Sequence, residues 1–369
     1  MNFEFSEEQN LLREQAQGFL QQNCGVDKVR AVLDSDTRFD AELYQKVADM
    51  GWTATAIPEQ YGGIGLGQLE LCVLAEELGK VVAPIPFSSS VYLATEALLL
   101  FGSDAQKSQH LPGIADGSTI ACLAIAEGVG PALPGKLKCR VENNKLFGTK
   151  LPVADGDVAQ LAIVVAEDGM YLADLTGAGV QRESIDTIDP TRSHASILFN
   201  GAECERLGEP SAAFTQLETL YDRAAILFAF EQVGGAHSAL DMAKEYALGR
   251  FAFGRSIASY QAIKHKLADM YIEATLAKSN AYFGAWALST NASELPVAAA
   301  TARVSATNAY HECSKENIQT HGGMGFTWEF DCHLHYRRAK LLASNLGGLR
   351  GWKHRLVTTL EQSNLALEA

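Results

Sequence analysis

The stretch YALGRFAFGRSIASYQAIKHKLADM, residues 246–270, is locally basic in an acidic chain and lies between two long helical patterns. No carboxylate occurs between Arg250 and Lys266, and the dipeptide Phe253-Gly254 interrupts the stretch in its middle. An aromatic residue followed by glycine is not expected in the middle of a simple solvated helix. Because guanidinium groups hold phosphates with a planar fork of donors, the stretch predicts a site for an anion.

The composition limits the classes of protein to consider. The chain has 369 residues, enough for two or three domains, and its formal net charge of -14 argues against a nucleic-acid-binding surface. We see neither a secretory signal nor an apolar run near the roughly 20 residues that span a bilayer. The seven cysteines are scattered and odd in number, as is typical of reduced thiols. We therefore expect a cytoplasmic protein with no membrane insertion.

Three regions follow one another along the chain. Residues 1–117 have helical patterns, beginning with a capping box of Ser6 and Gln9, and the helix over 69–84 is expected to end at Gly79 and Pro84. Residues 118–210 alternate as strands, with turns expected at 143–144 and 168–169. Residues 211–369 return to long helical periodicity and predict a four-helix bundle. The fold class is thus α+β: a helical domain, a small antiparallel β-barrel or sandwich, and a helical bundle.

Two weaker motifs are discounted. GPALPGKL, residues 130–137, has the spacing of a phosphate loop, but Leu137 stands where a serine or threonine must reach the metal. Histidines and cysteines crowd the last third of the chain without the paired spacing of a zinc site. We therefore expect no metal.

Several longer segments together resemble the acyl-CoA dehydrogenase family, nearly from end to end. The most specific are residues 246–270 and IQTHGGMGFTWE, residues 318–329. MGWTATAIPEQYGGIGLGQLELCVLAEELGK, residues 50–80, and DPTRSHASILFNGA, residues 189–202, are also similar to family segments. The resemblance implies an FAD-dependent oxidoreductase that desaturates acyl-CoA thioesters and passes electrons to an electron-transferring flavoprotein.

The resemblance also implies that FAD lies at a subunit interface, where the helices of one chain hold the nucleotide half of a neighbour's flavin. Arginine suits the pyrophosphate, phenylalanine gives an apolar wall, glutamines bond phosphate or ribose, and paired glycines let the backbone approach. The matching positions are Arg250, Phe253, Gln261, Gln319, Gly322 and Gly323.

The family's two usual positions for the catalytic base carry no acid in this chain. Leu346 stands at one position and Ala224 at the other. The nearest acids to the second position are Glu218 and Asp222, four residues apart on one helix face, and Asp222 is the candidate base. Glu231 lies in an apolar run, where a helix-packing partner is expected to satisfy it.

The flavin-facing strands depart from the family pattern too, with Pro152 and Ala154 at positions where the family carries tryptophan and threonine. The chain resembles the partner chains of α2β2 bacterial dehydrogenases that act on steroid-CoA thioesters, in which the unlike chain brings the base. Two alternatives remain open. One is a self-sufficient homotetramer that uses Asp222 or Glu218, and the other is a non-catalytic scaffold that kept the fold.

Overall fold

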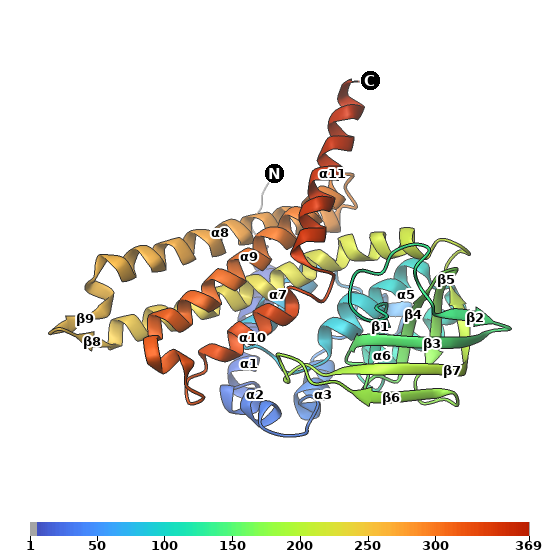
Figure 1. Ribbon diagram of the computed structural model, residues 1–369, viewed down its shortest axis with the longest axis horizontal. Helices are drawn as coiled ribbons and strands as arrows, with labels where there is room; N and C mark the ends of the chain where they lie inside the picture. The colour runs from blue at the N-terminus through green and yellow to red at the C-terminus, as the bar shows by residue number, and fades with distance from the viewer. Residues whose placement is uncertain (1–5, 369) are drawn as a thin grey trace. The chain divides into compact units, whose positions relative to one another are not determined.

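The computed structural model describes residues 6–368, with side chains for residues 6–362 (Figure 1). Helices run as far as Ala115, strands follow from Ala121 to Leu207, and helices return from Ala213. This order confirms the predicted α+β class. By packing, the chain divides into two compact units, one of residues up to 27, 68–83 and from 225 on, the other of residues 28–67 and 84–224. The domain boundaries at 117 and 210 stay a prediction.

The first unit is built from helices. Its elements are α1 (Glu7–Asn23), α4 (Gln68–Lys80), most of α7 (Ala213–Gly249), β8 (Phe251–Ala252), β9 (Arg255–Ser256), α8 (Gln261–Ser289), α9 (Leu295–His321), α10 (Cys332–Leu342) and α11 (Leu349–Glu368), with short 3₁₀ turns at Ile257–Ser259 and Gly322–Phe326. Ser6 and Gln9 cap α1 reciprocally, as predicted. Long α8 and α9 pack along each other.

Two glycines let α4 and α7 cross with their backbones in contact. A Cβ at Gly79 would lie 2.0 Å from the carbonyl oxygen of Glu231, and one at Gly234 would lie 1.9 Å from that of Glu76. The prediction that Gly79 ends its helix is therefore wrong, since α4 continues to Lys80. Glycine at these positions lets the two backbones approach closely. From one sequence alone, a glycine with this role cannot be told apart from a glycine that ends a helix.

The second unit combines short helices with the sheet. Its helices are α2 (Val26–Leu33), α3 (Ala41–Asp49), a π-helix (Ser88–Thr95), α5 (Glu96–Phe101) and α6 (Asp104–Ala115), with a 3₁₀ turn at Glu59–Tyr61. Its strands are β1 (Ala121–Ala124), β2 (Arg140–Glu142), β3 (Lys145–Ala154), β4 (Leu161–Ala166), β5 (Gly169–Asp174), β6 (Val180–Ser184) and β7 (His194–Leu207).

The seven strands form one open sheet in the order β1-β4-β5-β7-β3-β2, with β6 also paired to β7. All pairs are antiparallel except β1 with β4. Long β7 joins the two halves, because its first part pairs with β3 and β6 and its last part with β5. Among the described residues β1 and β2 do not pair with each other, so the sheet does not close into a barrel.

The two predicted turns have different outcomes. Asn143 and Asn144 have φ values of 52° and 60°, which confirms the predicted hairpin turn between β2 and β3. The other turn is one residue earlier than predicted, since Gly169 already pairs with Ala166 in the ladder. A Cβ at Gly169 would lie 2.3 Å from an Arg206 guanidinium nitrogen, but this is the end of a flexible side chain that can move aside, so space alone does not require glycine there.

Candidate cofactor site

Residues 250–260 form a tight hairpin between α7 and α8 rather than a helix. Strands β8 and β9 pair antiparallel, and the turn between them is Phe253-Gly254, with φ values of 54° and 80°. The Tyr260 hydroxyl donates to the Ala252 carbonyl at 2.9 Å and fixes the hairpin against the start of α8. Phe253 is 98% exposed. Its positive φ is a strained conformation for a bulky residue. The dipeptide that interrupts the basic stretch therefore builds a turn that presents a phenylalanine.

The cations of this stretch differ in what they contact. The Arg255 guanidinium lies 4.0 Å from the centre of the Tyr260 ring, and Lys266 forms an ion pair with Glu316 on α9. Arg250 is exposed, and within residues 6–362 its side chain has no ion-pair or hydrogen-bond partner. Arg250 is therefore the cation of the hairpin that is available to a ligand or to another chain.

The glycine-rich segment Gly322–Phe326 follows α9 as a 3₁₀ turn with its backbone open on one side. Gly322 has a φ of 62°, in the region that favours glycine, and a Cβ at Gly323 would meet no atom within 4 Å. Gly325 is different, because a Cβ there would lie 2.5 Å from the Ile318 carbonyl oxygen. The segment is thus fixed to the end of α9 on one side and accessible at Gly323 on the other.

An aromatic stack joins the end of α7 to the end of α9. The rings of Tyr246 and His321 lie 4.0 Å apart and 26° from parallel, and Phe330 packs edge-on against both. His321 is buried, its Nδ1 lies 2.9 Å from the Asn317 carbonyl oxygen, and burial lowers its pKa. This contact was not predicted from the sequence, because the periodicity of each helix does not show which of its side chains meets a side chain of another helix.

All six predicted cofactor residues belong to the same helical unit, and the Tyr246–His321 stack links the two segments that carry them. Arg250, Phe253, Gln261, Gln319 and Gly323 are exposed, and Gly322 is half-buried. Their contacts with a cofactor stay a prediction. Free donors and an open backbone fit a phosphate-bearing nucleotide presented from outside the chain.

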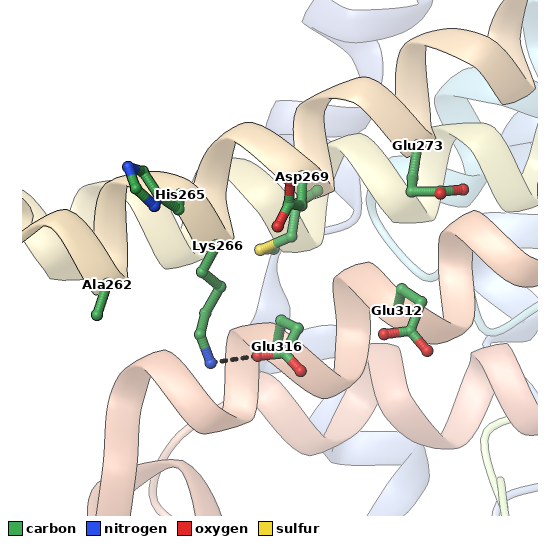
Figure 2. Close-up of a pocket in the computed structure, with 8 residues that line it drawn as sticks. Ala262, His265, Lys266, Asp269, Glu273, Glu312 and Glu316 are labelled. Atoms are coloured by element: carbon green, nitrogen blue, oxygen red, sulfur yellow. Dashed lines mark hydrogen bonds and ion pairs between the residues drawn. The ribbon is translucent and has the colours of Figure 1, made fainter.

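A second feature of the same unit does not fit an anion. The groove between α8 and α9 encloses about 490 Å³, and Asp269 and Glu273 from α8 face Glu312 and Glu316 from α9 across it (Figure 2). Lys266 pairs with Glu316, and Lys315 pairs with both Glu312 and Glu316, so the acidic side chains still outnumber the lysines at the groove. A groove of this charge does not favour phosphate, and the nucleotide contacts at the hairpin and the glycine segment stay a prediction.

The two family base positions are apolar and packed. Leu346 is 2% exposed, and its carbonyl oxygen accepts a hydrogen bond from the Trp352 indole at 2.9 Å. Ala224 is fully buried. The structure therefore uses both positions for packing, and neither can accept a proton.

The remaining acids differ in burial. Asp222 is 7% exposed and thus buried, and its neighbour Arg223 pairs with Glu96. Glu218 is exposed. Glu231 is buried with its Oε1 3.7 Å from Arg338 Nη1, which confirms the expected helix-packing partner. Asp222 stays the candidate base in this chain.

In the second unit, Glu127 and Lys150 form a structural pair. Lys150 is fully buried and donates to Glu127 at 2.8 Å and to the Ile125 carbonyl at 3.0 Å. Glu127 also accepts the backbone N–H groups of Lys138 and Cys139, and these contacts lower its pKa although burial opposes the shift. The pair closes the base of the 128–137 loop, so these residues have a structural reason to be present. Pro152 is exposed and offers no hydroxyl or aromatic group.

Comparison with known proteins decides the family. The acyl-CoA dehydrogenase N-terminal domain profile matches residues 6–118, and the C-terminal domain profile matches residues 214–348. Acyl-CoA dehydrogenase IpdE2 of Mycobacterium tuberculosis is 33% identical over 359 residues, covering 97% of this chain and 98% of the relative. The chain belongs to the acyl-CoA dehydrogenase family. FAD is the characteristic cofactor of these oxidoreductases, and the C-terminal match includes all six predicted cofactor residues.

Solved structures of the family share the whole fold. The ChsE4-ChsE5 complex from Mycobacterium tuberculosis contains a chain with a TM-score of 0.88 and 28% identity, covering 98% of this chain and 99% of that one. A chain of the Tcur3481-Tcur3483 steroid acyl-CoA dehydrogenase variant has a TM-score of 0.89 and 28% identity, covering 97% and 99%. Within residues 6–368, no helix combines the length and hydropathy needed to cross a membrane.

Proposed function

We propose that this chain is an FAD-dependent acyl-CoA dehydrogenase subunit that takes part in α,β-desaturation of a CoA thioester together with an unlike partner chain. One observation carries the proposal. The six predicted cofactor residues lie in one helical unit and all but Gly322 are exposed, whereas Leu346 and Ala224 fill both family base positions. A chain of this kind can complete a neighbour's cofactor site but needs a carboxylate from elsewhere.

The residues of this chain would act on the nucleotide half of the cofactor. Arg250 would hold the pyrophosphate with its donor fork, and the open backbone at Gly323 would allow close approach. Gln261 and Gln319 would donate to phosphate or ribose oxygens, and Phe253 would cover the adenine side. When bound, FAD supplies an acceptor for the hydride that leaves the β-carbon of the thioester.

The partner chain would supply the carboxylate that removes the α-proton. Two neighbours in fold support this arrangement, because one is described as a complex of two chains and the other is a paired steroid acyl-CoA dehydrogenase. We extend the proposal to a bulky, steroid-like acyl group, an electron-transferring flavoprotein as acceptor, and a cytoplasmic location.

Flavin content after expression tests the proposal. The chain alone should be colourless and should turn yellow when a second acyl-CoA dehydrogenase chain encoded beside it is co-expressed. Arg250→Ala should then weaken FAD binding about tenfold to hundredfold, since a hydrogen bond to a charged group contributes about 1.5–3 kcal/mol. Arg350→Ala is the matched control, because Arg350 on α11 is also exposed and without a side-chain partner among the described residues. Equal flavin content in both variants would remove Arg250 from the site.

A second candidate function is a self-sufficient homotetramer with Asp222 or Glu218 as base. The burial of Asp222 favours it, because a carboxyl shielded from water suits a proton acceptor better than a solvated one. A yellow, dye-reducing product from this chain alone, inactivated by Asp222→Asn, would support it. Absence of flavin in every combination would leave the scaffold alternative.

A further inference from the structure

We infer that Tyr246 is a positioning residue for the nucleotide contacts, because its stack on His321 sets the spacing between the two segments that carry them. This inference rests on the proposed function and goes beyond it. Tyr246 and Arg250 are four residues apart at the end of α7, so they lie on the same side of the helix end. His321 directly follows the turn that carries Gln319 and directly precedes Gly322.

The stack is a direct side-chain contact between the two segments. The Tyr246 and His321 ring centres are 4.0 Å apart, at the short end for stacked rings, and Phe330 is 6.2 Å from one and 5.8 Å from the other. Gly325 adds a second constraint, since a Cβ there would meet both the Ile318 carbonyl and the His321 Cβ. The glycine segment is therefore packed directly against the His321 end of α9 at Gly325.

The orientation of His321 is fixed from a third side. Its Nδ1 faces the Asn317 carbonyl oxygen at 2.9 Å, and a carbonyl can only accept, so Nδ1 carries the hydrogen. The imidazole is thus held by a hydrogen bond at one edge, by Tyr246 on one face and by Phe330 at another edge. If Tyr246 is removed, the ring loses the contact that ties it to the helix of Arg250.

The hydroxyl of Tyr246 plays no part in this arrangement. Within residues 6–362 it has no hydrogen-bond partner, so the ring alone makes the contact. Phenylalanine should therefore replace Tyr246 without loss, and leucine should not. This pair of variants separates the stack from any role of the hydroxyl.

The test measures FAD dissociation from the assembly in which the wild-type chain retains flavin, whether alone or with its co-expressed partner. Tyr246→Leu should weaken FAD binding about 2-fold to 10-fold, as expected for the loss of an aromatic pair, and Tyr246→Phe should match the wild type. Tyr271→Leu, at an exposed tyrosine of α8, controls for loss of an aromatic ring in the same unit. In the Arg250→Ala background the effect of Tyr246→Leu should shrink, because the two residues act through one contact.

Two further outcomes separate this inference from the proposed function. Flavin that is lost in Arg250→Ala but held normally by Tyr246→Leu would overturn the positioning role and leave the proposed function standing. A wild-type chain without flavin in either assembly would overturn both. Equal loss in the leucine and phenylalanine variants would also refute the stack, since it would assign the effect to the hydroxyl.

Discussion

The buried carboxylate of Glu231 allows a prediction whose size follows from the structure. Arg338 is 1% exposed, and its guanidinium lies 3.7 Å from Glu231 Oε1 and 3.2 Å from the Ala83 carbonyl oxygen. Replacing Glu231 by leucine would remove a carboxylate from beside this buried cation. Removing one partner of a buried pair costs about 3–5 kcal/mol, so Glu231→Leu should lower the free energy of unfolding by that amount.

A neighbouring cation makes the same change more costly. Arg303 is also fully buried, and burial lowers its pKa to about 10 while the charge of Glu231 acts against that shift. Its guanidinium donates to Gln232 at 2.7 Å and to the Leu342 carbonyl, both uncharged. The charge of Glu231 therefore stabilises the charged forms of two buried arginines, which favours the upper part of the range.

Urea unfolding followed by circular dichroism measures the effect. Glu273→Leu is the control, because Glu273 is exposed on α8 and should change stability by no more than about 0.5 kcal/mol. The double variant Glu231→Leu with Arg338→Leu should recover most of the loss, since an apolar pair can replace a buried ion pair. A loss below about 1 kcal/mol in the single variant would refute the reasoning.

Two further predictions concern Lys150 and His335. Lys150→Met removes the buried amine that holds Glu127, so it should lower the free energy of unfolding by roughly 1–3 kcal/mol and speed proteolytic cleavage within residues 128–137. An unchanged rate of cleavage would contradict a role for the Lys150–Glu127 pair in closing this loop. His335 is fully buried, and burial together with Arg338 lowers its pKa to about 4. In the unfolded chain the His335 pKa has its ordinary value of about 6.5, so between about pH 6.5 and pH 4 the unfolded chain binds more protons than the folded one. The free energy of unfolding should therefore fall as the pH drops through this window, by up to roughly 3 kcal/mol. His335→Gln should flatten that dependence in urea midpoints measured from pH 4 to 7, and an identical slope in both proteins would exclude His335 as its source.

Features set by local chemistry could be predicted from the sequence. The order of helices and strands, the capping box at Ser6 and the Asn143-Asn144 turn all depend on residues close together in the chain. The candidate cofactor set rests on the resemblance of two short segments to the family, and its contacts stay a prediction. Periodicity, capping and turn chemistry all act between residues that are close together in the sequence.

Features set by contacts between distant segments could not be predicted. Gly79 looked like a helix stop and proved to be the point where the main chain of Glu231 comes close. Long β7 divides its pairing among β3, β5 and β6, which lie in different parts of the sequence. The Tyr246–His321 stack joins two helices whose separate patterns contain no trace of the pairing.

The crossing of α4 and α7 has a mechanical consequence. At Gly79 and Gly234 the two main chains touch directly, so no rotamer change is available there to absorb a displacement of one helix against the other. A displacement of α4 toward α7 at this point therefore presses on the main chain of α7, the helix that ends one residue before Arg250. A bulkier residue at Gly79 or Gly234 would force these two helices apart.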